Sequence, residues 1–548
     1  MKTIVAIFAD FERTFWGGRS RLCDELAGTP VVHRTLRRAA QVSRAAACCL
    51  LVQPRDEQIA RRAVGEIAQN ERLEVLPADD GVRARRELIR SARKWNLDSW
   101  RGGPLCATWF DEFIEPRCAA QVLDVYAADA VLCLEAAQAV LDVDLADAMI
   151  AHAERYAGEA PLVFTQAPPG LAGIVLTREQ TQELLAQNIP VGILLGYRPE
   201  LARPDPITRP DCMRVASAVA QTQARFVADT QSAFERLGAL LARGNEPRDA
   251  GELCRDIAER GDGRSVRLPV EVEIELTTSD PLPLTCLRPR GEHAPTRQPA
   301  DVQAIARVAR ELAAQDDRLI FLGGHGDPLT HPHFAAVCQA IRRENVLGLA
   351  AATTLVELSD ENLEALLQSR VDLLEVQIDA ATPKGYARLH GRDAFEQVLA
   401  NIERIQSLRQ QRACPQPIVV PSITRCAATL PEIEEFYDRW IRVTGAALIR
   451  TYDTYCGALP ADAVSGVAPP VRGPCRRLDR RMMLLADGRA TLCAEDVVGA
   501  ASIGSWVEQP IERLWRGAAL ESARTRHATK SWSELPAICG KCNEWFRP

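Results

Sequence analysis

The sequence predicts an α/β protein of several domains that ends in a small cysteine-rich domain. Three observations support this prediction. The chain has 548 residues, a length that usually divides into three or four domains. Short apolar runs alternate with helical stretches in two separate series, as strands and helices do in α/β layers. Cysteines gather near the end, between Cys475 and Cys542.

Composition excludes several classes of protein. Hydrophobic residues make up 47% and charged residues 25% of the chain, as in ordinary globular proteins. A net charge of −7 gives no basic face for nucleic acid. The apolar runs are too short to span a bilayer, and the first residues lack a signal-peptide pattern. We therefore expect a cytoplasmic protein without nucleic-acid or membrane partners, whose cysteines need not form disulfides.

The first 203 residues are expected to form one α/β domain with mostly parallel strands, because buried apolar runs are separated by helical stretches. Its expected elements are strands at residues 3–8, 46–52, 129–134 and 162–165 and a helix at residues 31–40. Residues 204–265 become helical and charged. We interpret them as a connector that ends at the soft segment 261–264.

A second series of strands and helices fills residues 266–450. The expected strands are 270–276, 318–322, 347–353 and 373–378, and the expected helices are 302–314, 333–344, 360–369 and 395–408. Repeated β–α units of this length predict a full or partial parallel barrel. In such barrels the chemistry takes place where strands end and loops begin. Residues 451–548 lose this rhythm and form the predicted cysteine-rich domain.

The cysteines near the end have the spacing of a metal site. Cys475, Gly488 and Cys493 form C-x12-G-x4-C, and Cys539 and Cys542 form C-x2-C. These pairs supply the four sulfurs that Zn²⁺ or a [4Fe–4S] cluster requires. The sequence therefore predicts Cys475, Cys493, Cys539 and Cys542 as metal ligands. The ligand set alone does not separate zinc from iron–sulfur, and four unrelated buried cysteines remain the alternative.

Residues 475–542 resemble a SPASM domain. The resemblance is carried by Cys475-Arg-Arg-Leu, Ala486-Asp-Gly488, Cys493-Ala-Glu-Asp496 and Cys539-x2-Cys542. That domain follows the catalytic barrel of many radical S-adenosylmethionine enzymes and carries auxiliary [4Fe–4S] clusters. The full version has a further C-x5-C-x3-C stretch, which this sequence lacks. The resemblance therefore implies one auxiliary cluster.

Residues 268–446 resemble the radical S-adenosylmethionine barrel itself. Gly323-Gly-His-Gly-Asp-Pro328 is similar to the motif after the second strand, where the family holds the methionyl amine of the cofactor. Val376-Gln-Ile-Asp379 resembles the fourth-strand segment that contacts the ribose. The resemblance thus assigns cofactor binding to Gly323, Gly324, Gly326, Asp327, Pro328 and Asp379.

One departure from the family affects the chemistry. The family places C-x3-C-x2-C after the first strand, whereas residues 277–290 contain only Cys286, with Leu284 and Leu287 at motif positions. Leucine cannot ligate iron, and one thiolate cannot hold a cubane. S-adenosylmethionine is therefore expected as a cofactor only if the barrel binds a cluster through other ligands, and no catalytic residue is assigned. Other candidate ligands exist, although hydrogen-bonded histidines are commoner than metal-bound ones. They are His293, His325, His331, His333, Cys414, Cys426 and Cys456.

The start of the chain resembles a GT-A-type nucleotidyltransferase of the cytidylyltransferase sort. The matching segments are residues 4–9, Gly17-Gly-Arg-Ser-Arg21 and residues 26–31. Glycines let a backbone approach phosphates, and arginines can neutralise them, so Gly17, Gly18, Arg19 and Arg21 are candidate nucleotide-binding residues. The usual lysines and the metal-binding aspartate are missing, although Glu135 could partly substitute. Nucleotide binding without transfer is expected, and an empty turn is the alternative.

The three-part order resembles the spiro-SPASM proteins. It predicts three domains, at residues 1–203, 266–450 and 451–548, with a helical connector at residues 204–265. The expected function is that of a radical SAM/SPASM-type protein with one auxiliary [4Fe–4S] cluster, acting on a peptide or a nucleotide-linked sugar. The alternative is an inactive barrel that serves as a scaffold, with a structural iron–sulfur or zinc site.

Overall fold

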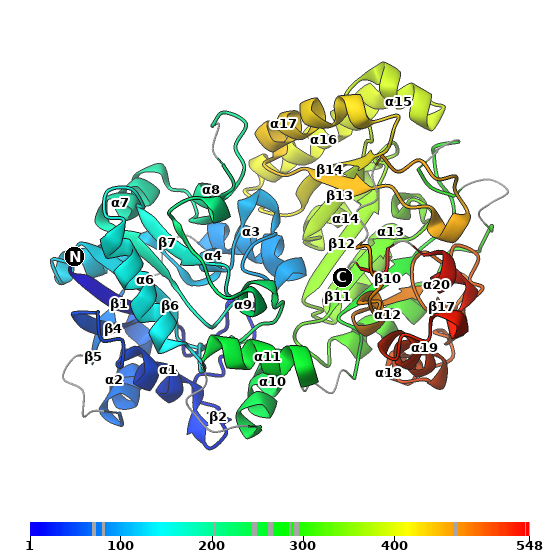
Figure 1. Ribbon diagram of the computed structural model, residues 1–548. Helices are drawn as coiled ribbons and strands as arrows, with labels where there is room; N and C mark the ends of the chain where they lie inside the picture. Colours follow the sequence, from blue (N-terminus) through cyan, green and yellow to red (C-terminus); the bar gives the residue numbers. More distant parts are fainter. Residues whose placement is uncertain are drawn as a thin grey trace. The chain divides into compact units, whose positions relative to one another are not determined.

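The computed structural model describes most of the chain (Figure 1). The described residues are 1–67, 73–78, 83–201, 204–243, 249–260, 267–283, 287–289, 295–464, 469–542 and 544–546. The chain divides into two compact units, Met1–Ser265 and Val266–Pro548. Within the described residues, no helix combines the length and apolar character that crossing a membrane requires.

The first unit is built on a seven-stranded sheet in the order β5-β4-β1-β6-β8-β7-β9. The strands are β1 (Thr3–Ala9), β4 (Ala47–Val52), β5 (Leu73–Pro77), β6 (Ala130–Glu135), β7 (Leu162–Thr165), β8 (Ile174–Thr177) and β9 (Cys212–Met213). Strand β1 pairs in parallel with β4 on one side and with β6 on the other. Residues 4–7 are completely buried, as expected for a central parallel strand covered on both faces. The four predicted strands are present, but β8 is antiparallel to its two neighbours.

Helices surround this sheet (Figure 1). They are α1 (Val31–Ala39), α2 (Glu57–Gly65), α3 (Arg83–Arg93), α4 (Phe110–Phe113), α5 (Pro116–Val125), α6 (Val143–Arg155), α7 (Arg178–Gln187), α8 (Gly192–Leu195), α9 (Ser217–Gln221), α10 (Gln231–Ala242) and α11 (Ala250–Arg260), beside a ribbon of β2 (Glu25–Leu26) and β3 (Thr29–Pro30). Residues 204–243 and 249–260 belong to this unit, because β9 extends its sheet and Phe226 is buried in its core. The predicted soft boundary at residues 261–264 lies outside the described residues.

The second unit contains a nine-stranded sheet in the order β15-β14-β13-β12-β11-β10-β16-β17-β18. Six strands follow one another in chain order and pair in parallel, namely β10 (Glu271–Glu275), β11 (Leu319–Gly323), β12 (Gly348–Thr353), β13 (Leu373–Gln377), β14 (Ile418–Arg425) and β15 (Leu448–Thr451). The connecting helices are α12 (Val302–Leu312), α13 (Phe334–Arg343), α14 (Asp360–Gln368), α15 (Pro383–His390), α16 (Phe395–Gln411) and α17 (Ile433–Thr444). The predicted α/β class and partial barrel are confirmed. Strands β14 and β15 were not predicted.

The cysteine-rich tail continues the barrel sheet. Strand β16 (Arg481–Leu484) pairs in parallel with β10, and β17 (Arg489–Thr491) and β18 (Ser502–Ser505) follow as antiparallel strands. Helices α18 (Ile511–Trp515), α19 (Ala518–Ala528) and α20 (Ala537–Lys541) complete the tail. Trp506 and Trp515 are among the largest fully buried side chains of the protein. The tail therefore shares a hydrophobic core with the barrel.

Candidate functional site

Five cysteines form a group in the tail, with Cys542 at its centre. We define the tail cysteine group as Cys456, Cys475, Cys493, Cys539 and Cys542. The thiols of Cys456 and Cys542 are joined by a hydrogen bond. Cys542 also interacts electrostatically with each of the other three. Each of the other three predicted ligands is therefore a neighbour of Cys542, and so is Cys456, whose spacing in the sequence gave no signal.

Three of these sulfurs accept hydrogen bonds from the backbone just after them. The sulfur of Cys542 accepts from the N–H of Glu544 at 3.3 Å. Cys493 accepts from the N–H of Glu495, and Cys475 from those of Arg477 and Leu478. In each case a donor lies two residues after the cysteine. Such bonds favour the thiolate over the thiol, which is the form that ligates metals.

Burial acts in the opposite direction on most of the group. It raises the pKa of Cys475 and Cys493, and it raises the pKa of Cys539 to about 12. The pKa of Cys542 is lowered to about 7, mainly by the hydrogen bond from Cys456. Because ligating thiols must lose their protons, metal binding here would release protons.

The donor chemistry of the tail cysteine group fits an iron–sulfur cluster or zinc, since thiolates serve both. Over the part of the chain that the structure describes, no three histidine, cysteine, aspartate or glutamate side chains converge closely enough to hold a metal ion. The thiols are thus neighbours around Cys542 and do not converge on a single point.

A cavity of about 300 Å³ opens at the ends of the barrel strands. Gly323, Gly324 and Asp379, three of the residues assigned to the cofactor, line it, and so does Cys493 of the tail. Gly326, Asp327 and Pro328 are not among the lining residues. The cavity therefore connects the glycine loop after β11 with one side of the tail cysteine group.

The glycine loop needs its glycines because it presses against the end of β10. Gly324 has φ +84°, and its N–H donates to the carboxylate of Glu273 at 2.9 Å. A Cβ at Gly324 would lie 2.7 Å from the Cβ of Glu275, and a Cβ at Gly326 would lie 2.2 Å from the carbonyl oxygen of Thr277. The loop could not pass this close to β10 with side chains at these positions.

The carboxylate of Asp327 is occupied by hydrogen bonds from the end of β12 and from its own loop. Its buried carboxylate accepts from the hydroxyl of Thr353 at 2.9 Å and from the N–H and hydroxyl of Thr354 at 2.8 and 2.6 Å. It also accepts from the N–H of Leu329 at 3.0 Å. In this arrangement Asp327 fastens the loop to the end of β12. Asp379, in contrast, lies on the cavity with φ 58° and accepts from the N–H of Thr424 at 2.7 Å.

The other candidate ligands near the barrel have structural partners. His331 bonds the carbonyl of Ala300 at 3.0 Å and accepts from the N–H of His333 at 3.1 Å. His325 is buried on the cavity, 6.0 Å from the ring of Tyr455. Leu287 packs with Cys426 in a small hydrophobic cluster. Leu284, Cys286 and His293 lie outside the described residues.

Two acidic residues, Asp453 and Glu495, line the same cavity as Cys493. Burial and a hydrogen bond with Glu495 raise the pKa of Asp453 to about 9. Glu495, which pairs with Arg477, keeps a lowered pKa because hydrogen bonds and the arginine charge outweigh its burial. Within the pair, the neutral form is therefore favoured at Asp453 and the charged form at Glu495.

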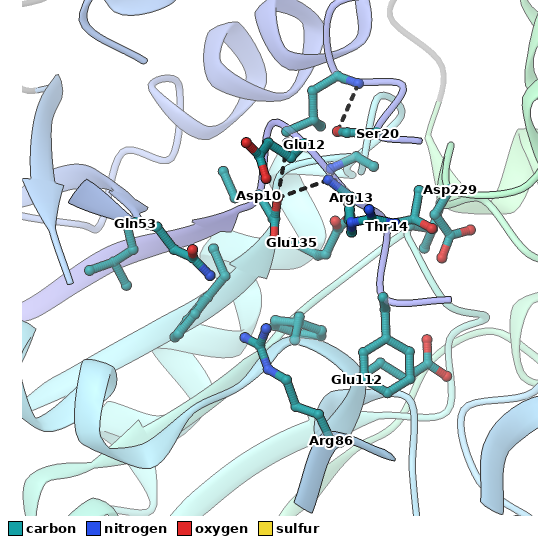
Figure 2. Close-up of a pocket in the computed structure, with 18 of the residues that line it drawn as sticks. Asp10, Glu12, Arg13, Thr14, Ser20, Gln53, Arg86, Glu112, Glu135 and Asp229 are labelled. Carbon is teal, nitrogen blue, oxygen red and sulfur yellow. Dashed lines mark hydrogen bonds between the residues drawn. The ribbon is translucent and has the colours of Figure 1, made fainter. Parts of the chain in front are cut away.

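A second cavity, of about 670 Å³, lies in the first unit (Figure 2). Asp10 follows β1, Gln53 follows β4 and Glu135 ends β6, so three parallel strands deliver these side chains to one edge of the sheet. In Figure 2 the guanidinium of Arg86 points toward them from below. Strand β1 lies between β4 and β6, so the strand order reverses here, and ligands of open α/β sheets bind at such places.

Only two of the four residues predicted to bind a nucleotide line this cavity. Gly17, with φ +87°, and Arg21 line the cavity, but Gly18 and Arg19 do not. The Arg19 side chain is 69% exposed and pairs with Asp24 at 2.6 Å. Asp10 and Gln53 were not predicted, although each directly follows a buried strand, which is a signal that could have identified them.

A buried ion network forms one wall of the cavity in the first unit. Arg225 donates to Asp229 at 2.5 and 2.8 Å and to Glu112 at 2.6 Å. Arg93 donates to the other oxygen of Glu112 at 2.8 Å. Burial, followed by the charge of Asp229, raises the pKa of Glu135 to about 8. Along this wall, the neutral form of Glu135 is therefore favoured, whereas the carboxylates of Glu112 and Asp229 are balanced by arginine.

Two family models match parts of the second unit. Residues 286–426 match the family model described as the radical SAM superfamily, and residues 475–543 match that of SPASM, an iron–sulfur cluster-binding domain. An uncharacterized protein of Treponema pallidum (strain Nichols) is 26% identical over 306 residues, which are 51% of this chain and 79% of that protein.

Two solved structures each resemble about half of the chain. Streptococcus suis SuiB, bound to its precursor peptide SuiA, is 12% identical with a TM-score of 0.40, over 51% of this chain and 73% of SuiB. A cytidylyltransferase of Leptospira borgpetersenii is 10% identical with a TM-score of 0.33, over 48% of this chain and 95% of that protein.

Proposed function

We propose that this chain, a radical SAM/SPASM protein, holds one [4Fe–4S] cluster on its tail cysteine group, beside the barrel cavity. The observation that carries the proposal is the position of Cys493, which belongs to the tail cysteine group and also lines the cavity. A cluster bound there would exchange single electrons with a molecule in the cavity. We name Cys475, Cys493, Cys539 and Cys542 as its ligands, with zinc as the alternative metal.

The residues around these thiols suit such a group. Backbone N–H groups reach the sulfurs of Cys475, Cys493 and Cys542, and hydrogen bonds to sulfur tune the potential of a cluster. Arg477 is buried close to Cys493 and would offset the negative charge of its thiolate. These features support binding of a cluster by the cysteines of the tail.

For the barrel, we propose that S-adenosylmethionine and the substrate share the cavity. Gly323, Gly324 and Asp379 would face the cofactor, while Gly326, Asp327 and Pro328 hold the loop in place. The cavity is polar and carries charges of both signs, including Arg450 and Glu273. Such a lining suits a polar substrate, for which we propose a peptide or a nucleotide-linked sugar.

A second candidate function is a binding scaffold without radical chemistry. Two observations favour it. The segment after β10 contains only Cys286 where three thiolates are expected, and the carboxylate of Asp327 is occupied by hydrogen bonds from Thr353 and Thr354 at the end of β12. In this case the tail group, iron–sulfur or zinc, would stabilise the fold through metal binding.

For the first unit, we propose that its cavity binds a nucleotide. Gly17 and Arg21 lie on the cavity, and Gly18 and Arg19 belong to the same loop. The position at the carboxyl ends of β1, β4 and β6 supports a ligand site on general grounds. Glu135 replaces the usual metal-binding aspartate and holds a proton, which favours binding over magnesium-dependent transfer.

The test is anaerobic purification with quantification of iron, sulfide and zinc, followed by EPR of the reduced protein. We expect about four irons per chain in the wild type and their loss in Cys475→Ala/Cys493→Ala. Cys414→Ala is the matched control, because that half-buried thiol donates to the carbonyl of Gln416 and lies outside the tail group. About eight irons would show that the barrel also holds a cluster. Zinc without iron would reject the redox function and leave the scaffold.

A further inference from the structure

The tail cysteine group contains one thiol more than a cubane cluster uses. Each of the four irons takes one cysteine, and Cys475, Cys493, Cys539 and Cys542 already supply four. Cys456 is the fifth. It lies in the turn Tyr455–Gly457, which follows β15. Its separation in sequence from the other cysteines matches no recognised ligand spacing.

Cys456 is placed among the proposed ligands. Its thiol is hydrogen-bonded to Cys542 and interacts electrostatically with Cys493. Cys539 also interacts with Cys542, but its other neighbour is Cys475. Cys456 and Cys539 are therefore both neighbours of Cys542, and the turn that carries Cys456 contacts α20, which carries Cys539.

The backbone fixes the position of Cys456. Tyr455, Cys456 and Gly457 have φ values of 47°, 56° and 92°, in the left-handed region that non-glycine residues rarely adopt. The turn is held by Asp453, which accepts from the N–H of Tyr455 at 2.7 Å, and by the carbonyl of Thr454, which accepts from Gly457 at 3.0 Å. Strained turns of this kind persist only where their surroundings determine them.

From these contacts we infer that Cys456 is an exchangeable ligand of the tail group, which can replace Cys539. Cys475, Cys493 and Cys542 are then common to both ligand sets, because their sulfurs are the ones that accept backbone N–H groups. Cys539 and Cys456 complete the set in turn. The inference rests on the proposed cluster function and specifies which thiols that cluster uses.

The experiment compares iron, sulfide and EPR spectra of the anaerobically reconstituted full chain in four forms. These are the wild type, Cys539→Ala, Cys456→Ala/Cys539→Ala and Cys475→Ala. We expect Cys539→Ala to keep about four irons with a shifted EPR signal, because one thiolate has been exchanged for another. The double variant and Cys475→Ala should keep less than about a quarter of that iron. Cys539→Ser, a near-isosteric change, should behave as Cys539→Ala does.

Other outcomes would overturn the inference. If both Cys539 variants lose iron as completely as Cys475→Ala, then Cys456 cannot replace Cys539. If the double variant keeps its iron, then Cys456 is not the replacement. A wild type that binds no iron would overturn the proposed function and this inference together, whereas the first two outcomes overturn the inference alone. Circular dichroism of each variant establishes that it is folded.

Discussion

Arg297 donates from its Nη1 to the carboxylate of Glu275 across 3.0 Å, with both side chains almost completely buried. Glu275 ends β10, and Arg297 lies on the chain that returns from this strand toward α12. The same guanidinium donates to Asp487 at 3.1 Å and to the carbonyl of Val497 at 2.5 Å, which are both in the tail. One arginine therefore fastens the first barrel strand to the segments on either side of Cys493.

Replacement of Arg297 should destabilise the second unit. Arg297→Ala would leave Glu275 buried without its ion pair, and removal of one partner from a buried pair costs about 3–5 kcal/mol. We expect a loss of this size in the free energy of unfolding, measured by urea denaturation. We also expect a lower iron content, because the segments around Cys493 lose an anchor.

Arg310→Ala is the control for this prediction. Arg310 pairs with Glu344 at 2.8 Å on the surface of the same unit, with a side chain that is 67% exposed. Water and salt screen such pairs, so the variant should unfold as the wild type does. Equal effects of the two substitutions would contradict the special role of Arg297.

The ion network of the first unit leads to a second prediction. Arg225 neutralises both Glu112 and Asp229, and its guanidinium also lies 5.3 Å above the ring of Trp16. Arg225→Gln should therefore lower the free energy of unfolding by about 3–5 kcal/mol. Arg19→Gln, which breaks only the exposed pair with Asp24, should cost less than about 1 kcal/mol. Thermal and urea unfolding of the two variants would reveal the difference, and a stable Arg225→Gln protein would refute the prediction.

Glu135 should make stability depend on pH. In the folded protein its pKa is raised to about 8, whereas its ordinary value is 4.5. Between these values the folded state holds a proton that the unfolded chain has released, so stability falls as pH rises through this window. Glu135→Gln carries no titrating group and should be less sensitive, by about 1–3 kcal/mol between pH 5.5 and 8.5. Parallel pH profiles of the unfolding free energy in wild type and variant would contradict this assignment.

Several strands could be predicted because their sequences are continuous apolar runs. The strand expected at residues 162–165 has the bounds Leu162–Thr165, and the one expected at residues 46–52 begins one residue later. Strand β15 was missed for the opposite reason. Its first residues, Leu448 and Ile449, are exposed, and it is an edge strand that ends in Arg450 and Thr451. Such a segment has neither a continuous apolar run nor a regular alternation.

The candidate sites could be predicted only where ligands are close together in sequence. The C-x2-C spacing identified Cys539 and Cys542, whereas Cys456 joins them through the fold alone. The motif position of Asp327 was recognised, but its orientation toward Thr353 and Thr354 depends on the neighbouring strand. Local spacing shows which residues are available, and tertiary contacts decide which of them meet.

The glycine loop offers a last prediction, which separates the shape of the backbone from side-chain chemistry. A Cβ at Gly326 would lie 2.2 Å from the carbonyl oxygen of Thr277 and 2.7 Å from that of Ser279, and neither backbone oxygen can move alone. Gly326→Ala should therefore shift the loop and cost about 1–3 kcal/mol in unfolding free energy. Gly65→Ala is the control, because that glycine lies in α2 with no atom within 4 Å of an added Cβ. Alanine there should raise stability by up to about 1 kcal/mol. If Gly326→Ala is as stable as the wild type, the close contact between the loop and β10 is not required for folding.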